Sequence, residues 1–405
     1  MKYIKRSAES TIKKQEKMFK AILVTGARQV GKTTMLKNLK SNTNYITLDD
    51  MILNQAAIED PNLFLKSNKP PIIIDEIQYA PDLLRYIKIE IDNSEEKAMF
   101  YLTGSQQFHL MKNVSESLAG RIGILNLLGL SLREIKNIDF NKVFVPTEDY
   151  IAEKGKYDMK ISYDEIWDII HKGTMPALYQ ENIDFEMYYS MYVNTYIERD
   201  VRNLTQVGDT LTFLKFMTAL ASRIGQLLNL NNVANEVGIT IPTAQRWLSI
   251  LVSSNIVYLL EPYYNNIMKR AIKTPKIYFL DTGLVAYLTK WKNKEVLEAG
   301  NMAGSFFENF VIIEIIKSYY NNGELRPPLY FYRDKEKNEI DLIIEQNGQL
   351  HPIEIKKSAT PTKEMISNFK VLEKLGNVGE GGLICMYDKV INFNEKNKVI
   401  PYNYL

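Results

Sequence analysis

This chain of 405 residues contains one cysteine, Cys385, which excludes an intrachain disulfide and fits a reducing compartment. The apolar neighbours of Cys385 favour a buried small residue over a nucleophile. No hydrophobic run approaches the length of a membrane span, and the N-terminal residues MKYIKRSAES lack the apolar core of a signal peptide. We therefore expect a cytoplasmic protein without a membrane partner.

The chain also lacks a large excess of either charge, because 50 Lys and Arg residues oppose 48 Asp and Glu residues, for a formal net charge of +2. A strongly basic body is thus excluded, and any contact with nucleic acid must be regional. The composition is that of an ordinary soluble globular protein. A chain of this length has room for two or three domains.

The most informative stretch is 21–39, AILVTGARQVGKTTMLKNL, where a β-branched run precedes a glycine-rich segment and a helical pattern. Its centre fits the GxxxxGKT phosphate loop in the required strand–loop–helix setting. The glycines let backbone N–H groups turn toward a phosphate at a helix N-terminus, where the helix dipole also favours negative charge. A glycine-rich turn without a ligand is the alternative. The predicted ATP-binding residues are Gly26, Ala27, Arg28, Gln29, Val30, Gly31, Lys32, Thr33 and Thr34.

Two acidic residues, Asp75 and Glu76, directly follow the buried strand expected at 72–74. Ligands of open α/β sheets gather at the carboxyl ends of the strands. We therefore expect Lys32 to contact the β- and γ-phosphates and Thr33 to hold Mg²⁺ together with Asp75. Glu76 would polarise the attacking water as a general base. An acid pair that only starts a helix is the structural alternative.

A strand at 44–48 separates the two phosphate motifs, and a glutamate follows the aspartate. Together these features indicate the additional-strand, catalytic-glutamate branch of P-loop ATPases. Another strand, at 98–103, ends near Ser105 and Gln106, which are candidates for sensing the γ-phosphate or holding the water. Arg121 closes a helical stretch and is either an arginine finger, in cis or on a neighbour, or a surface arginine at a helix C-terminus.

The segments on either side of this domain carry weaker signals. Residues 1–20 are predicted to form a basic helix with a solvated face and no assigned chemistry. Residues 162–204 have a helical and aromatic pattern that predicts a lid over the nucleotide. Within it, Arg199 and Arg202 either contact phosphate or join a structural ion-pair cluster, and we favour the cluster.

A helix-turn-helix with a wing is predicted in the middle of the chain, from helices at 211–224, 233–237 and 242–253 and a strand at 256–260. Winged helices bind either DNA or proteins, so both kinds of partner stay open. The residues expected to contact DNA are Gln245 and Arg246 on the third helix and Lys269, Arg270, Lys273 and Lys276 on the return side of a hairpin that turns near Asn265 and Asn266.

The segment 330–357 carries Asn347-Gly348 between two alternating runs, the signal of a type I′ hairpin. That turn sets Asp341 opposite Glu354, with Lys356 on the same face. Opposed carboxylates repel unless a cation lies between them. We therefore predict a second site for Mg²⁺ or Mn²⁺, held by Asp341, Glu354 and an inward-facing helix acid, Glu308, with Lys356 as a catalytic cation. A solvated charged hairpin is the alternative.

The motifs TGARQVGKTT, IIIDEIQ, YLTGSQQF, ESLAGRI, TYIERDVRNL, KTPKIYFLDTGL and FENFV…YRDKEKNEIDLII…IEIKK resemble, nearly end to end, bacterial and archaeal AAA-type ATPases with a C-terminal DUF4143 region. The resemblance implies a P-loop ATPase parallel sheet at 1–140, a helical lid at 141–205, a winged helix at 206–290 and a restriction-endonuclease-like α/β domain of PD-(D/E)xK type at 291–405. It also implies that the helix acid, strand Asp and Glu-x-Lys of that nuclease superfamily correspond to Glu308, Asp341, Glu354 and Lys356.

The function expected from these features is an ATPase that couples its nucleotide state to a DNA-binding and DNA-cleaving C-terminal module. A rival hypothesis is a nucleotide-loaded switch that hydrolyses ATP rarely and whose C-terminal domains bind protein partners. A third is an ATPase whose nuclease fold only holds nucleic acid. Whether the chain forms a homo-oligomer stays open.

Overall fold

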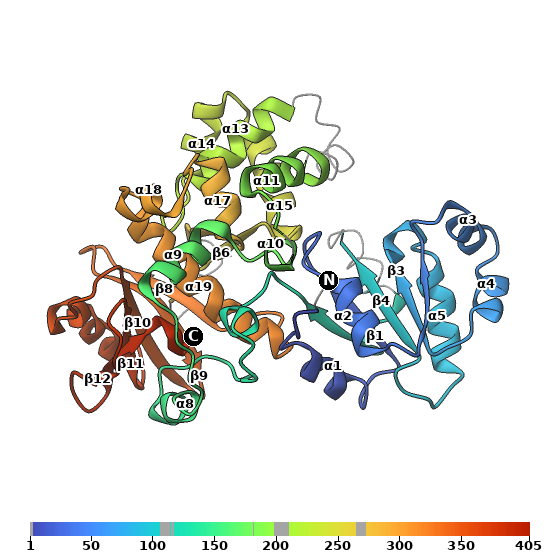
Figure 1. The fold of residues 1–405 in the computed structure, drawn as a ribbon, viewed down its shortest axis with the longest axis horizontal. Coiled ribbons are helices and arrows are strands. Elements are labelled where there is room, and N and C mark those ends of the chain that lie inside the picture. Colours follow the sequence, from blue (N-terminus) through green and yellow to red (C-terminus); the bar gives the residue numbers. More distant parts are fainter. Residues whose placement is uncertain (1–2, 106–113, 115–116, 181, 198–209, 265–272) are drawn as a thin grey trace.

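The computed structural model describes residues 3–405 except 106–113, 115–116, 181, 198–209 and 265–272 (Figure 1). The N-terminal part is a parallel sheet in the order β2-β3-β4-β1-β5. The strands are β1 (Ala21–Thr25), β2 (Asn44–Thr47), β3 (Ile72–Asp75), β4 (Phe100–Gly104) and β5 (Ile122–Asn126). Because β1 and β3 are buried throughout, their continuous apolar runs suit a sheet covered on both faces.

Helices cover this sheet on two sides, and alternate residues of β1 divide between two cores. Ala21 and Leu23 pack with one group of helices, and Ile22 and Val24 face the core that continues into the rest of the molecule. The first group comprises α3 (Met51–Glu59), α4 (Pro61–Ser67) and α5 (Leu83–Asp92). The P-loop helix is α2 (Lys32–Leu39), and a short 3₁₀ turn, η1 (Ile77–Tyr79), follows β3.

The middle of the chain is helical. After β5 come α7 (Leu132–Ile135), α8 (Glu148–Lys154), α9 (Tyr163–Lys172), α10 (Ala177–Gln180), α11 (Phe185–Tyr192) and η2 (Val193–Ile197). The next group has α13 (Thr210–Ala221), α14 (Leu230–Val237) and α15 (Ile241–Ser253), then an antiparallel strand pair, β6 (Val257–Leu260) and β7 (Lys276–Phe279). Thr240 caps α15 and Gly238 ends α14 in the left-handed conformation, so the turn chemistry expected between these helices is present.

The C-terminal part is a mixed sheet in the order β12-β13-β11-β10-β9-β8. Its strands are β8 (Leu329–Arg333), β9 (Glu339–Gln346), β10 (Gln349–Lys356), β11 (Gly381–Cys385), β12 (Ile391–Asn392) and β13 (Asn397–Pro401), with the 3₁₀ segments η3 (Lys363–Lys374) and η4 (Tyr402–Tyr404). The predicted hairpin register is confirmed, because Gln346 pairs with Gln349 across Asn347 and Gly348, which have φ values of 51° and 73°.

A single long helix, α19 (Ala303–Asn321), crosses the middle of the molecule and is buried on nearly every side (Figure 1). It contacts β5 of the first sheet, β7 of the strand pair and β10 of the C-terminal sheet, and it follows the helices α17 (Thr282–Leu288) and α18 (Lys294–Ala299). The strand pair also reaches the C-terminal sheet directly. There the N–H of Tyr263 donates to the carbonyl of Phe331 at 2.6 Å, and the N–H of Phe331 donates to Glu261 at 3.0 Å.

Helices able to cross a membrane are absent from the described ranges, since none is both long and apolar enough.

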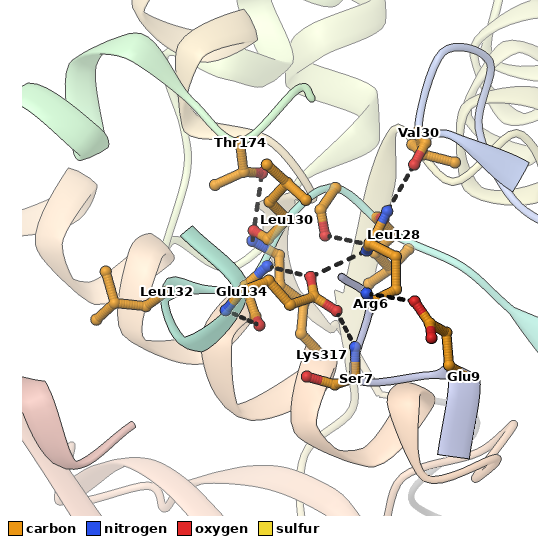
Figure 2. Close-up of polar contacts among 12 residues, drawn as sticks. Arg6, Ser7, Glu9, Val30, Leu128, Leu130, Leu132, Glu134, Thr174 and Lys317 are labelled. Carbon is orange, nitrogen blue, oxygen red and sulfur yellow. Dashed lines mark hydrogen bonds and ion pairs between the residues drawn. The ribbon is translucent and has the colours of Figure 1, made fainter. Parts of the chain in front are cut away.

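The N-terminal segment differs from the prediction of a solvated basic helix (Figure 2). Arg6 is 3% exposed, and α1 (Glu9–Gln15) buries one of its faces. The Arg6 guanidinium donates to the carbonyl oxygens of Val30 at 2.7 Å, in the P-loop, and of Leu128 at 2.7 Å, and it lies 3.1 Å from the carboxylate of Glu134. Sequence periodicity missed this role because nothing local distinguishes a buried arginine from an exposed one.

Replacing Arg6 tests this buried ion pair. Arg6→Ala should lower the free energy of unfolding by about 3–5 kcal/mol, because Glu134 would remain buried without its cation. Lys5→Ala is the matched control, since Lys5 pairs with Asp139 at an exposed position and its loss should change stability little. Urea unfolding followed by tryptophan fluorescence measures both variants. Equal losses in the two would contradict the structural role given to Arg6.

Candidate functional site

The P-loop has the backbone geometry that phosphate binding requires. Gly26 has φ 143°, and a Cβ atom there would lie 2.0 Å from the carbonyl oxygen of Leu127, so only glycine fits. Gly31 has φ 90° and starts α2. Lys32 is 6% exposed, and its ammonium donates to the carbonyls of Gly26 at 3.1 Å and Ala27 at 2.8 Å. The amine therefore lies inside the loop, next to where a phosphate would bind.

Asp75, at the carboxyl end of β3, lies directly beside the P-loop. Its carboxylate accepts hydrogen bonds from the Thr33 hydroxyl at 2.7 Å, the Tyr45 hydroxyl at 2.9 Å and the Thr103 hydroxyl. Burial, together with the charge of Asp75, raises the pKa of the Tyr45 phenol, so this hydroxyl stays protonated and donates. Tyr45 and Thr103 were not among the predicted site residues. Thr103 lies near the carboxyl end of β4, which was an available signal, whereas Tyr45 lies inside β2 and gave none.

Glu76 has φ 57°, a left-handed conformation that is uncommon for a non-glycine residue. Its backbone N–H donates to the Thr103 hydroxyl at 3.1 Å. Its carboxylate accepts hydrogen bonds from Ser105 at 3.3 Å and from the Gln78 side chain. Ser105 was a candidate and does lie beside Glu76, whereas Gln78 was missed. The other candidate, Gln106, lies outside the described residues.

A cavity of about 820 Å³ lies between the P-loop and the helical segment of residues 176–195. This volume suits a nucleotide-sized ligand. The P-loop side of its wall includes Arg28, Gln29, Gly31, Lys32, Thr33, Thr34 and Glu76. The opposite side includes Pro176, Met187, Tyr188, Met191 and Tyr192 from α11 and its neighbours, and the Tyr188 hydroxyl donates to Gln29 at 2.8 Å. Helical residues thus face the P-loop across the cavity, and Arg199 and Arg202 lie outside the described residues.

Arg121 is not positioned to act on the nucleotide of its own chain. It precedes β5, whose first residue pairs with Ala21 at the start of β1, and the P-loop follows the other end of β1. The Arg121 guanidinium instead lies 2.6 Å from Asp92 in a half-exposed ion pair. The arginine-finger interpretation in cis is therefore wrong, because the whole length of the parallel strands separates Arg121 from the phosphate site.

In the C-terminal part, the hairpin brings together the residues that its register predicted. The Lys356 ammonium lies 2.6 Å from the carboxylate of Glu354 and 3.2 Å from that of Asp341. The backbone N–H of Ile355 also donates to Asp341 at 2.9 Å. Pro352 is accommodated because the pairing between β10 and β11 begins only at Ile353.

The prediction that Lys276 is one of the cations that contact DNA phosphates is wrong, because its side chain is buried among acids. Its side chain is 3% exposed and lies 2.6 Å from Glu339, 3.5 Å from Glu308 and 3.9 Å from Asp341. Two residues further along β7, the Tyr278 hydroxyl donates to Glu308 at 2.7 Å. Lys276, Tyr278 and Glu339 were missed as members of this cluster. For Lys276 and Tyr278 the signal was the alternation of the KIYF strand, which puts both side chains on one face.

Several buried charges meet in this acid cluster, which consists of Glu308, Glu339, Asp341 and Glu354 with Lys276 and Lys356. Burial, reinforced by repulsion from Asp341, raises the pKa of Glu354 to about 8 and that of Glu308 to about 7. One carboxylate oxygen of Glu354 is buried without a hydrogen-bond partner. Within the described residues, no three His, Cys, Asp or Glu side chains are arranged to hold a metal ion. The ammonium groups of Lys276 and Lys356 lie between these carboxylates instead.

The remaining predicted residues belong to the DNA-contacting set. Gln245 and Arg246 are exposed on α15, and Lys273 is exposed just before β7. Lys269 and Arg270 lie outside the described residues, as does the predicted turn of the hairpin near Asn265 and Asn266. Lys276 does not belong with these exposed residues, because its side chain is buried.

Comparison with known proteins gives matches along most of the chain. Residues 18–136 match the family model described as AAA domain, residues 163–295 a domain of unknown function (DUF8612) and residues 303–405 a domain of unknown function (DUF4143). Uncharacterized proteins of Mycobacterium bovis and Mycobacterium tuberculosis are each 29% identical over 361 residues, covering 88% of this chain and 75% of theirs.

Solved structures are more distant. A Walker-type ATPase of Pyrococcus abyssi aligns with a TM-score of 0.44 at 14% identity, covering 69% of this chain and 94% of its own. A RuvB variant of Thermotoga maritima aligns with a TM-score of 0.28 at 18% identity, covering 62% of this chain and 85% of its own. The family matches and the parallel sheet show that the chain combines an AAA-type P-loop ATPase domain with a C-terminal DUF4143 region.

Proposed function

We propose that this protein hydrolyses ATP in the cavity between the P-loop and α11, with Glu76 as the general base. The observation that carries the proposal is the hydroxyl of Thr33 bonded to Asp75 at 2.7 Å, with Glu76 next in the chain and on the cavity wall. A hydroxyl and a carboxylate side by side at the end of a P-loop suit the Mg²⁺ that accompanies ATP. When bound, that ion would neutralise charge on the β- and γ-phosphates.

Each residue near the phosphates then has a defined task. The N–H groups of the P-loop bind phosphate oxygens, and Lys32 supplies a positive charge to the β- and γ-phosphates. Glu76 accepts a proton from the attacking water, whose oxygen bonds to the γ-phosphorus as the bond to ADP breaks. Ser105 and Gln78 orient the Glu76 carboxylate through their hydrogen bonds to it. Thr103 links the two residues, since its hydroxyl donates to the Asp75 carboxylate and accepts from the backbone N–H of Glu76.

The acid cluster supports a second activity, metal-dependent cleavage of a phosphodiester in nucleic acid. Glu308, Asp341 and Glu354 would hold Mg²⁺ or Mn²⁺, which prefer carboxylate oxygens. The proposal rests on two observations: Glu308 and Asp341 both lie within 3.9 Å of the Lys276 ammonium, and a buried Glu354 oxygen lacks a hydrogen-bond partner. Lys356 would stabilise charge that develops on the phosphate.

Double-stranded DNA is the partner that we propose for the module of α13, α14, α15, β6 and β7. Three helices followed by an antiparallel strand pair is the order of a winged helix, and α15 exposes Gln245 and Arg246. A module that binds a protein partner, with the ATPase domain as a switch, is the rival function. The two differ in their salt dependence, because counterion release accompanies contacts to phosphates.

Replacing Glu76 tests the catalytic base. Glu76→Gln should keep ATP binding and lose at least about a hundredfold in turnover, because the amide cannot take a proton from water. Lys32→Ala should instead lose tight ATP binding. Glu95→Gln, at an exposed position, is the isosteric control and should hydrolyse ATP like the parent. Phosphate release measures turnover and calorimetry measures binding. Parental turnover by Glu76→Gln would show that another group activates the water.

Removing two exposed cations tests DNA contact. Replacing both Arg246 and Lys273 with Ala should weaken binding to duplex DNA and reduce the logarithmic salt slope by up to about two. The control replaces Lys66 and Arg85, two exposed cations on the ATPase domain, with Ala and removes the same charge. Fluorescence anisotropy across a salt series measures the slopes. The same slope in both double variants would favour the protein-partner function.

A further inference from the structure

We infer that Lys276 is a positioning residue that occupies the acid cluster as an internal cation and yields Glu308 and Asp341 to a divalent metal ion. The inference rests on the metal site proposed above. It explains why the three predicted ligands lie together without forming a metal-binding arrangement.

Lys276 comes from outside the sheet that carries most of the acids. It begins β7, and its backbone pairs with Leu227 in an isolated bridge. Its ammonium enters between β9, which carries Glu339 and Asp341, and α19, which carries Glu308. A lysine with a side chain 3% exposed needs partners for its charge, and these three carboxylates supply them. The buried cation of the acid cluster, Lys276, therefore comes from the neighbouring strand pair of β6 and β7.

The ammonium faces the same oxygens that a metal would need. The Oε1 atom of Glu308 accepts hydrogen bonds from both the Lys276 ammonium and the Tyr278 hydroxyl. The Oδ1 atom of Asp341 lies 3.9 Å from the Lys276 ammonium. A bound Mg²⁺ or Mn²⁺ would be held directly by these carboxylate oxygens. Two cations that close together would repel strongly in a buried site. Lys276 and a metal ion therefore compete for Glu308 and Asp341.

Glu339 can keep the Lys276 ammonium paired when a metal ion binds Glu308 and Asp341. It lies 2.6 Å from Lys276, the shortest of the three contacts, and its other oxygen pairs with Arg333 at 3.2 Å. A shift of the ammonium toward Glu339 would free Glu308 and Asp341 while keeping the lysine paired. The backbone also approaches Glu308 closely, because a Cβ atom on Gly225, which has φ 75°, would lie 3.3 Å from its carboxylate. The cluster thus exchanges one cation for another in a confined space.

The test is calorimetric titration of Mn²⁺ into the nucleotide-free, full-length protein. Lys276→Met keeps an apolar stem and removes the charge, so Mn²⁺ should bind about tenfold more tightly than to the parent, since a buried competing charge is gone. Lys292→Met makes the same substitution at an exposed position with no assigned role and should bind Mn²⁺ like the parent. Parental or weaker affinity in Lys276→Met would overturn the role of Lys276.

Asp341→Asn separates this inference from the metal site on which it rests. If Asp341→Asn binds Mn²⁺ as the parent does, the metal site itself is absent. If it loses Mn²⁺ while Lys276→Met binds at parental strength, only the competition is wrong. Should Lys276→Met fail to fold without metal, millimolar Mn²⁺ should restore its tryptophan fluorescence, because the metal replaces the missing cation. Lack of recovery in Mn²⁺ would also contradict the inference.

Discussion

The arrangement of this molecule depends on the burial of one helix, α19, between its two candidate sites. Buried charges are costly unless they are paired, and α19 carries Glu314 and Lys317 at buried positions. The Glu314 carboxylate accepts a hydrogen bond from the N–H of Leu132 at 2.7 Å, and Lys317 donates to the carbonyl of Leu130 at 2.8 Å. These bonds fix the helix against the segment that leaves the ATPase sheet.

The same polar network reaches the P-loop. Arg6 joins the carbonyl of Val30 to the carboxylate of Glu134, and Glu134 lies in α7, whose first N–H is the one that Glu314 accepts. Glu308 stands six residues before Glu314 on the same helix, about 9 Å along its axis. A short path of hydrogen bonds and one rigid helix therefore connects the phosphate loop with the acid cluster.

What could be predicted from the sequence was chemistry encoded locally. The phosphate loop, the Asp75–Glu76 pair and the hairpin register each depend on neighbouring residues whose spacing determines their geometry. The Asn347-Gly348 turn alone sets which residues of β9 and β10 face one another, because side chains alternate along a strand. For the same reason Asp341, Glu354 and Lys356 were assigned to one face.

What could not be predicted depends on segments that meet only in the folded chain. Lys276 follows a run of exposed-looking cations, and only its contact with β9 and α19 distinguishes it from Lys273. Arg6 lies in a charged N-terminal segment and is recognised as buried only beside Val30 and Glu134. The local sequence around a cation is the same whether the cation is buried or exposed, because burial is a property of the tertiary structure.

We propose that the ATPase domain and the modules that follow it work as one unit on DNA. The most direct measurement is steady-state ATP hydrolysis in Mg²⁺ over a range of duplex DNA concentrations that saturates binding. The account predicts that turnover rises several-fold and levels off as the DNA-binding isotherm saturates. Turnover that stays constant while the DNA becomes fully bound would contradict the account.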